Sequence, residues 1–209
     1  MEKQEIRTFG RRHGKKLSAR KAWLMENILP KIAPNESESN EVLEIGFGAG
    51  EHVREIAIAN PDKIIIGAEP FVNGVAALLS AICDDDNNIK DEYKNIRIWP
   101  DDVRLILNNG KYKFSEIWVL HPDPWPKARH EKRRLLSSEF LNLLSKNLAT
   151  GGKIIIGTDH WGYYDWILDQ VKNTSLKIDA TESEIIQTRY QQKNMAHTDS
   201  PKYIILKNK

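Results

Sequence analysis

Two kinds of hydrophobic pattern alternate along this chain. Short, nearly continuous apolar runs predict buried β-strands, and they cover residues 42–45, 63–68, 96–99, 117–120, 153–157, 176–178 and 203–206. Longer segments carry apolar residues at helical spacing and predict helices, which run through residues 53–57, 75–82, 103–107, 135–148 and 163–171. The alternation predicts an α/β fold, a doubly wound and mostly parallel sheet with helices on both faces.

The chain before the first strand has a different pattern. Residues 1–16 show no apolar periodicity, which predicts a mobile arm. Ser18 can cap a helix that ends before Pro34, because a serine hydroxyl accepts a hydrogen bond from the first helical turn. The apolar side of this helix is expected to carry Trp23, Leu24, Ile28 and Leu29.

A polar stretch, residues 34–41, follows this helix and is typical of a linker. We therefore divide the chain into an arm, helix and linker over residues 1–41 and a main α/β domain over residues 42–209. At 209 residues the chain is long enough for one globular domain with a full core, and marginal for two.

Charge is distributed unevenly, although the net charge is only +2. Residues 1–31 hold nine Lys and Arg against three Asp and Glu, and residues 127–134 hold five against one. The remainder is acidic. Two basic segments on an acidic body indicate a localised site for a polyanion such as nucleic acid, with solvated basic faces as the alternative interpretation.

The composition also excludes several classes of protein. Cys83 is alone, so no intramolecular disulfide and no cysteine cluster for zinc can form, and we expect no metal. No apolar run approaches the length of a membrane span, and the basic N-terminus lacks the apolar core of a secretory signal. These features predict a cytoplasmic protein with no membrane association. They leave its oligomeric state open.

A glycine loop, EIGFGAG, joins the first predicted strand to its helix and is the first candidate binding element. Gly46, Gly48 and Gly50 allow a sharp turn that brings backbone N–H groups close to a ligand at a helix N-terminus. Glu51 stands where a dinucleotide fingerprint has its third glycine, so a pyrophosphate would meet a negative charge. A cationic sulfonium ligand meets no such conflict.

Acidic residues stand at the ends of the first three predicted strands, at Glu44, Glu69 and Asp101. Glu69 lies nineteen residues past Gly50, where a carboxylate can accept both hydroxyl protons of a ribose. Asp101 is a candidate acceptor for an adenine amino group. Together with the glycine loop, these residues favour S-adenosylmethionine over NAD as the cofactor.

A proline-rich loop, HPDPWPKARHEKRR, follows the fourth predicted strand and is the second candidate binding element. Pro122, Pro124 and Pro126 have a fixed φ and no N–H, so they predict a stiff loop. Because α/β folds bind ligands at the carboxyl ends of their strands, Asp123 and Trp125 are candidate site residues. A solvated proline turn is the alternative interpretation.

Cations of this loop and of the arm are candidates to hold phosphates, with Lys127 beside them. The candidates are Arg11, Arg12, Lys15, Lys16, Arg129, Lys132, Arg133 and Arg134. Asp159 ends the fifth predicted strand and is expected to face the same crevice as Asp123. A helix N-cap is the alternative role for Asp159.

These motifs together resemble the bacterial tRNA (guanine-N7-)-methyltransferases. The resemblance covers nearly the whole chain, through RTFGRRHGKKLS, EIGFGAG, GAE, PDD, PDPWPKARHEKRR, TD and TRY. The PDPWPKARHEKRR run is specific to the family, whereas many methyltransferases share the glycine loop. The resemblance implies a Rossmann-like class I methyltransferase that uses S-adenosylmethionine to methylate N7 of a guanine in the variable loop of tRNA.

The resemblance also implies roles for particular residues. It places Glu44, Glu69, Asp101 and Asp123 at the cofactor, with Asp123 as the active-site residue as well. It assigns substrate binding to Lys127, Asp159, Thr188 and Gln191.

Three positions depart from the family pattern. Gln191 stands where the family usually has Glu, and a carboxamide accepts hydrogen bonds less well than a carboxylate and carries no charge. This substitution puts the role of Gln191 in guanine binding in doubt. Ala68 and His121 also replace residues that are usually larger or differently polar, with no consequence that the sequence indicates.

The chemistry of the expected reaction limits what the protein must supply. Guanine N7 has an exposed lone pair and no proton, so its methylation requires no general base. We expect catalysis by positioning and by the charge of Asp123. The alternatives are a class I methyltransferase that acts on an exocyclic amine or a protein, suggested by the D-P-W sequence, a non-catalytic RNA-binding protein of the same fold, and a nicotinamide oxidoreductase.

Overall fold

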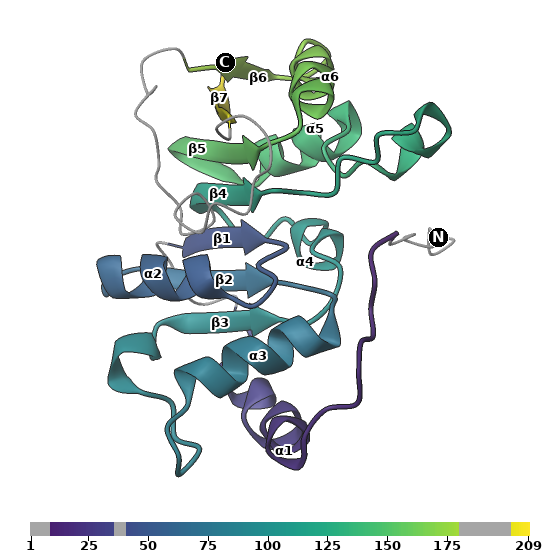
Figure 1. The fold of residues 1–209 in the computed structure, drawn as a ribbon. Coiled ribbons are helices and arrows are strands. Elements are labelled where there is room, and N and C mark those ends of the chain that lie inside the picture. The colour runs from purple at the N-terminus through teal and green to yellow at the C-terminus, as the bar shows by residue number, and fades with distance from the viewer. Residues whose placement is uncertain (1–8, 36–40, 180–201) are drawn as a thin grey trace. The chain divides into compact units, whose positions relative to one another are not determined.

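The computed structural model of the chain describes residues 9–35, 41–179 and 202–209. Its helices and strands alternate along the chain (Figure 1). The strands are β1 Glu41–Ile45, β2 Ile64–Ala68, β3 Ile96–Trp99, β4 Phe114–Leu120, β5 Leu148–Thr158, β6 Leu176–Ile178 and β7 Lys202–Asn208. The α-helices are α1 Ala19–Asn27, α2 Glu51–Ala59, α3 Val72–Ile82, α4 Arg104–Leu107, α5 Ser138–Lys146 and α6 Trp161–Val171. The 3-10 helices are η1 Leu29–Ile32, η2 Asp91–Tyr93 and η3 Ala128–Arg133.

The strands pair in the order β3-β2-β1-β4-β5-β7-β6, as a seven-stranded sheet. β2 pairs with β3 in parallel, with Ile65 opposite Ile96, and β4 pairs with β5 in parallel, with Ile117 opposite Ile154. β7 runs antiparallel to both β5 and β6. The predicted α/β class with a mostly parallel sheet is therefore confirmed.

Contacts between residues divide the chain into two compact units. Unit 1 holds residues 1–39 and 44–109, and unit 2 holds residues 40–43 and 110–209. In unit 1, α1 packs against α3, η1 packs against β3, and α2 packs against β2 and β3. In unit 2, α5 and α6 pack against each other and against β5. The sequence boundary at residues 41 and 42 stays a prediction.

The first helix confirms one expectation and corrects another. The hydroxyl of Ser18 accepts a hydrogen bond from the backbone N–H of Lys21, as predicted for an N-cap. Leu24 and Ile28 are buried, but Trp23 is 45% exposed, so its predicted place on the apolar side is wrong. Adjacent helical positions lie about 100° apart, and burying Leu24 turns Trp23 away from the core.

The region around residue 148 also differs from the prediction. The helix ends at Lys146, and Leu148, expected as helical, opens β5 instead. β5 runs through the glycine pair, and the pairing with β4 shifts register between Phe114 and Glu116. A Cβ on Gly152 would lie 2.8 Å from the carbonyl oxygen of Phe114, so glycine is required at this irregularity.

The described part of the arm is fixed to the N-terminus of α3. The backbone N–H of Val72 donates to the carbonyl of Arg12 over 3.0 Å. The Asn73 side chain accepts from Gly14 N at 2.8 Å and donates to the carbonyl of Lys15 at 2.7 Å. Residues 12–15 of the arm thus contact α3, and the mobility expected for residues 1–16 stays a prediction. Across the described ranges, no helix is long and apolar enough to cross a membrane.

Candidate cofactor and substrate sites

The glycine loop after β1 has the conformation that its sequence predicts. Gly46, Gly48 and Gly50 have φ values of 76°, 58° and 76°, in the left-handed region that favours glycine. The N–H of Gly46 donates to the carbonyl of Ala68 over 2.8 Å, which joins the loop to the end of β2. A Cβ on Gly46 or Gly48 would meet nothing within 4 Å, so the loop borders open space at both positions.

Helix α3 approaches this loop closely through Gly74, a residue that the sequence patterns did not single out. A Cβ on Gly74 would lie 2.4 Å from the carbonyl oxygen of Gly48. A Cβ on Gly50 would lie 2.6 Å from Leu78 of the same helix. Gly74 interrupts an apolar helical pattern, which is a sequence signal for close packing.

Glu69 braces the glycine loop from the end of β2. One carboxylate oxygen accepts the N–H of Gly48 at 2.8 Å, and the other accepts the N–H of Phe71 at 2.9 Å. Glu69 is 8% exposed. Burial raises the pKa of its carboxyl group, and the two N–H groups lower it by less, so the pKa lies above its ordinary value. Each oxygen keeps a second lone pair, so the carboxylate can also accept ribose hydroxyl protons.

Glu44, at the end of β1, is held by a histidine of the next helix. Its carboxylate lies 3.0 Å from Nδ1 of His52, and both side chains are largely buried. His52 was not a candidate in the sequence, because a single histidine in a first helical turn carries no distinctive signal.

The two acidic residues after β3 have different surroundings. Asp102 accepts the backbone N–H of Arg104, the first residue of α4, at 3.0 Å, and it forms an ion pair with the Arg104 side chain, at 2.6 Å between Nη2 and Oδ2. The side chain of Asp101 is 42% exposed and forms an ion pair with Arg12 of the arm. Arg12, a predicted phosphate ligand, is thus paired with the predicted adenine acceptor.

The proline-rich loop after β4 begins and ends its turn with unusual backbone angles. His121 and Trp125 have φ values of 48° and 42°, and they are two of the three non-glycine residues with positive φ in the described ranges. Residues 122–126 form no regular element. Asp123 is exposed and lies between His121 and Trp125. Their positive φ angles cost conformational energy, so the surrounding structure must hold them.

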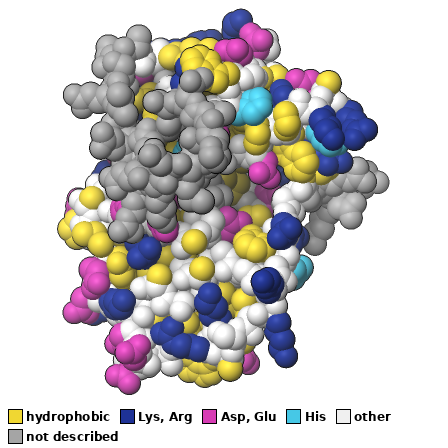
Figure 2. Space-filling model, viewed as in Figure 1, with side chains coloured by type: hydrophobic (Ala, Val, Ile, Leu, Met, Phe, Trp, Pro, Cys, Tyr) yellow, Lys and Arg dark blue, Asp and Glu magenta, His cyan; other side chains and the backbone are white. Residues whose placement is uncertain are grey.

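Basic side chains gather on the segment that follows, η3. In Figure 1 this segment projects away from the strands of unit 2, and Figure 2 shows a dense group of Lys and Arg side chains on one projection. Arg129 and Lys132 are exposed, as is Lys127 before them. Arg133 lies over the Trp125 ring, with 4.9 Å between its guanidinium carbon and the ring centroid. One face of Trp125 is therefore covered by a cation.

Arg134 does not match its predicted role as a phosphate ligand. Its side chain is 8% exposed, and its guanidinium donates to the backbone carbonyl oxygens of Pro124 and Trp125. A buried guanidinium that is committed to carbonyls is not available to an RNA backbone, so the sequence interpretation is corrected here.

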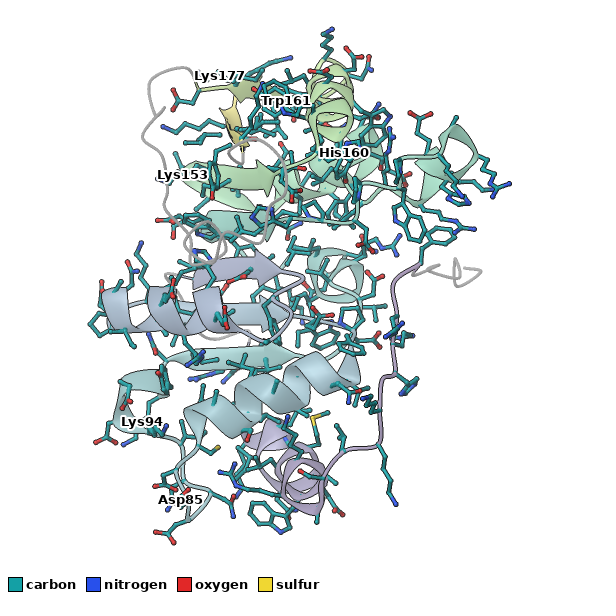
Figure 3. The ribbon with its side chains drawn as sticks, in the orientation of Figure 1. Asp85, Lys94, Lys153, His160, Trp161 and Lys177 are labelled. Carbon is teal, nitrogen blue, oxygen red and sulfur yellow. The ribbon has the colours of Figure 1, made fainter. Side chains whose placement is uncertain are left out.

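The junction between β5 and α6 excludes one of the two interpretations of Asp159. The N-cap of α6 is His160, labelled with Trp161 in Figure 3, and its Nδ1 accepts from the N–H of Tyr163 at 3.1 Å. Asp159 is therefore not the helix cap. Its charge acts on His121, whose pKa is lowered by burial and raised in part by Asp159.

The remaining candidates lie on the arm or outside the described residues. Arg11, Lys15 and Lys16 are exposed on the arm. Thr188 and Gln191 lie outside the described residues. Within the described ranges, no group of three or more His, Cys, Asp or Glu side chains is placed to hold a metal ion.

Comparison with known proteins gives consistent similarities. A family described as "Putative methyltransferase" matches residues 38–203. A tRNA (guanine-N(7)-)-methyltransferase of Neorickettsia sennetsu is 39% identical over 182 residues, covering 86% of this chain and 81% of that protein. The enzyme of the same name from Rhodospirillum rubrum is 33% identical, covering 99% of this chain and 89% of that protein.

Solved structures that resemble the chain share its fold at low identity. An antibiotic-related methyltransferase aligns with a TM-score of 0.56 at 12% identity, covering 92% of this chain and 95% of that one. The 16S rRNA methyltransferase KamB aligns with a TM-score of 0.53 at 14% identity, covering 93% of this chain and 96% of that one. These likenesses confirm the class I methyltransferase fold.

Proposed function

Because the chain belongs to the tRNA (guanine-N(7)-)-methyltransferase family, we propose that it transfers a methyl group from S-adenosylmethionine to N7 of a guanine in the variable loop of tRNA. The observation that carries the proposal is the similarity to named enzymes of this activity over nearly the whole chain. The compartment proposed with it is the cytoplasm.

The cofactor is assigned to residues of unit 1. The open positions at Gly46 and Gly48 and the buried carboxylate of Glu69 fit a nucleoside. Glu51, in the first turn of α2, would repel a pyrophosphate but not a cationic sulfonium group. When bound, S-adenosylmethionine supplies an electrophilic methyl group. Glu69 would accept ribose hydroxyl protons, Asp101 an adenine amino proton, and Glu44, oriented by His52, adds negative charge.

The guanine is assigned to residues of unit 2. N7 carries no proton, so the protein has only to hold the base and to stabilise the charge that moves onto the purine. Asp123 suits this role because its carboxylate is exposed on a stiff loop. Lys127 and Asp159 are proposed to bind the substrate, together with Thr188 and Gln191.

The tRNA backbone is assigned to accessible cations of the two basic segments. In unit 2 the proposed phosphate ligands are the exposed Arg129 and Lys132 and the half-buried Arg133. On the arm of unit 1 they are the exposed Arg11, Lys15 and Lys16. Phosphate binding of this kind releases counterions, so it depends on salt. Trp125 offers its ring to a base only from the side that Arg133 leaves open.

The direct test is methyl transfer from labelled S-adenosylmethionine to bulk tRNA, followed by nucleoside analysis of the product. We expect N7-methylguanosine. A label on an exocyclic amine, or on protein alone, would replace the proposal with another class of methyltransferase. Calorimetry is expected to show binding of S-adenosylmethionine and S-adenosylhomocysteine without binding of NAD, and comparable NAD affinity would contradict the cofactor assignment.

A further inference from the structure

We propose that Arg134 is a positioning residue for Asp123, because it fixes the backbone of the proline-rich loop through hydrogen bonds to two of its carbonyl oxygens. The inference rests on the proposed function, in which Asp123 acts on the guanine. It gives a buried cation of the basic segment a role that is separate from RNA binding.

All three nitrogens of the Arg134 guanidinium have partners, and two of these partners are carbonyls of the loop. Nε donates to the carbonyl of Pro124 at 2.9 Å, and Nη2 donates to the carbonyl of Trp125 at 3.3 Å. Nη1 pairs with Glu131 at 2.8 Å. The two carbonyls belong to consecutive residues that directly follow Asp123, so the guanidinium fork sets the direction in which the loop leaves Asp123.

Two aromatic rings of α6 hold Arg134 in place. Its guanidinium carbon lies 5.6 Å from the Tyr163 ring centroid and 5.0 Å from that of Trp166. Tyr163 is fully buried, and its hydroxyl accepts the N–H of Leu136 at 3.4 Å. Burial raises the pKa of Tyr163 to about 12, so the ring stays a neutral phenol. The guanidinium is thus anchored to a helix that packs on β5.

The sequence of the loop explains why it needs an external donor. Pro122, Pro124 and Pro126 have no N–H, so the loop has few donors of its own with which to close hydrogen bonds. Its carbonyls remain as acceptors, and its positive φ angles at His121 and Trp125 need an outside constraint to persist. Arg134 supplies that constraint. A lysine ammonium lacks the planar fork that spans both carbonyls.

The expected consequence is loss of rate without loss of RNA affinity. A misplacement of the reacting groups by about 1 Å can cost on the order of 10²-fold in rate. Removing a phosphate-binding side chain would instead weaken tRNA binding and reduce its dependence on salt. These two outcomes separate a positioning residue from a residue of the RNA interface.

The experiment compares Arg134→Ala and Arg134→Lys with the wild-type chain and with Lys172→Ala, which removes an exposed cation elsewhere in unit 2. Three quantities are measured: the single-turnover rate at saturating cofactor and tRNA, the salt dependence of tRNA affinity, and the affinity for S-adenosylhomocysteine. The rate of Arg134→Ala is measured again with added guanidinium chloride, and with sodium chloride at matched ionic strength. Circular dichroism establishes that each variant is folded.

We expect Arg134→Ala to lose on the order of 10- to 100-fold in rate, with an unchanged salt slope. Arg134→Lys should lose nearly as much, and guanidinium, but not sodium, should restore several-fold of the rate of Arg134→Ala. Wild-type rates in both Arg134 variants, or a shallower salt slope with no rate loss, would overturn the inference. If Arg134→Ala does not fold, Arg134→Lys decides by the same two readings. A wild-type chain that fails to methylate tRNA would contradict the proposed function instead.

Discussion

The glycine loop of unit 1 and the proline-rich loop of unit 2 both have an irregular backbone, and the two backbones are held in opposite ways. Each follows a β-strand and must hold an irregular backbone still. The glycine loop does so without side chains at its turning points, and Glu69 braces it by accepting the backbone N–H of Gly48. The proline-rich loop lacks N–H groups at three positions and is held through its carbonyls by Arg134.

The two loops offer a ligand different kinds of contact. A glycine loop presents backbone and empty space, which suits the close approach of a nucleoside. A proline-rich loop presents side chains on a rigid support, which suits a residue that must act at one position. We therefore expect changes in the first loop to alter cofactor affinity and changes in the second to alter rate.

The largest expected effect is that of Asp123→Asn, which tests the second half of this comparison. The substitution keeps the shape of the side chain but removes its charge and turns one acceptor into a donor. The single-turnover rate should fall on the order of 10²-fold or more, by analogy with the removal of other groups that stabilise transition-state charge. Affinity for S-adenosylhomocysteine, measured by calorimetry, should change far less, and an equal loss in both would place Asp123 in ground-state binding.

Glu69→Ala tests the first half. It removes a brace of the glycine loop and the proposed ribose acceptor, and cofactor affinity should weaken by about 1–3 kcal/mol. Asp62→Ala, an exposed carboxylate of the same unit, serves as the control and should bind normally.

The pH dependence of cofactor affinity sharpens this test. The ionised form of Glu69 accepts ribose protons, and burial raises the pKa of this carboxyl above its ordinary value. Affinity for S-adenosylhomocysteine is therefore complete above the raised pKa and is lost as the pH falls through it. Calorimetry at a series of decreasing pH values should show this step in the wild type and not in Glu69→Gln.

Gly74→Ala tests whether the glycine loop depends on its neighbour α3. The added methyl would lie 2.4 Å from the Gly48 carbonyl oxygen, so the loop or the helix must move. Overpacking of this kind typically costs about 1–3 kcal/mol of stability, and cofactor affinity should fall with it. Gly162→Ala, in a helix of unit 2, meets its nearest atom at 3.3 Å and should leave cofactor affinity unaltered.

A smaller effect is expected for the arm. Replacing Arg11, Lys15 and Lys16 with alanine keeps the Arg12–Asp101 pair and the backbone hydrogen bonds to Asn73. The dependence of log affinity for tRNA on log salt should become shallower, by about 0.7–0.9 for each phosphate that the arm no longer neutralises. Filter binding measures the slope, and the pair Lys172→Ala and Lys177→Ala is the control. An unaltered slope would mean that the arm does not touch RNA.

The smallest expected effect is on the pH profile of the wild-type single-turnover rate. It should be nearly flat from about pH 6 to 8, because N7 gives up no proton. A rate that rises tenfold per pH unit in this range would show that a deprotonation limits the step, and the role given to Asp123 would be wrong.

Features encoded locally were predictable from the sequence, and features that depend on distant partners were not. The strands follow from apolar runs, the glycine loop from its spacing, and the cap of α1 from Ser18. The pairing of Arg12 with Asp101 joins residues 89 positions apart, and no local pattern signals it. In the sequence, nothing distinguishes Arg134 from the other cations of its basic run. Its burial depends on where α6 packs, because its guanidinium lies against two aromatic rings of that helix.

The place of β7 in the sheet has a consequence for how the protein is made. β7 comes after β5 and β6 in the chain but lies between them in the sheet. β5 and β6 are therefore synthesised before β7, the strand that pairs with both of them. Until then the isoleucines at 154–156 of β5 stand along an unpaired edge, since their partners are residues 204–206. A chain that stops before Lys202 carries that open apolar edge, and exposed edges of this kind are prone to aggregation.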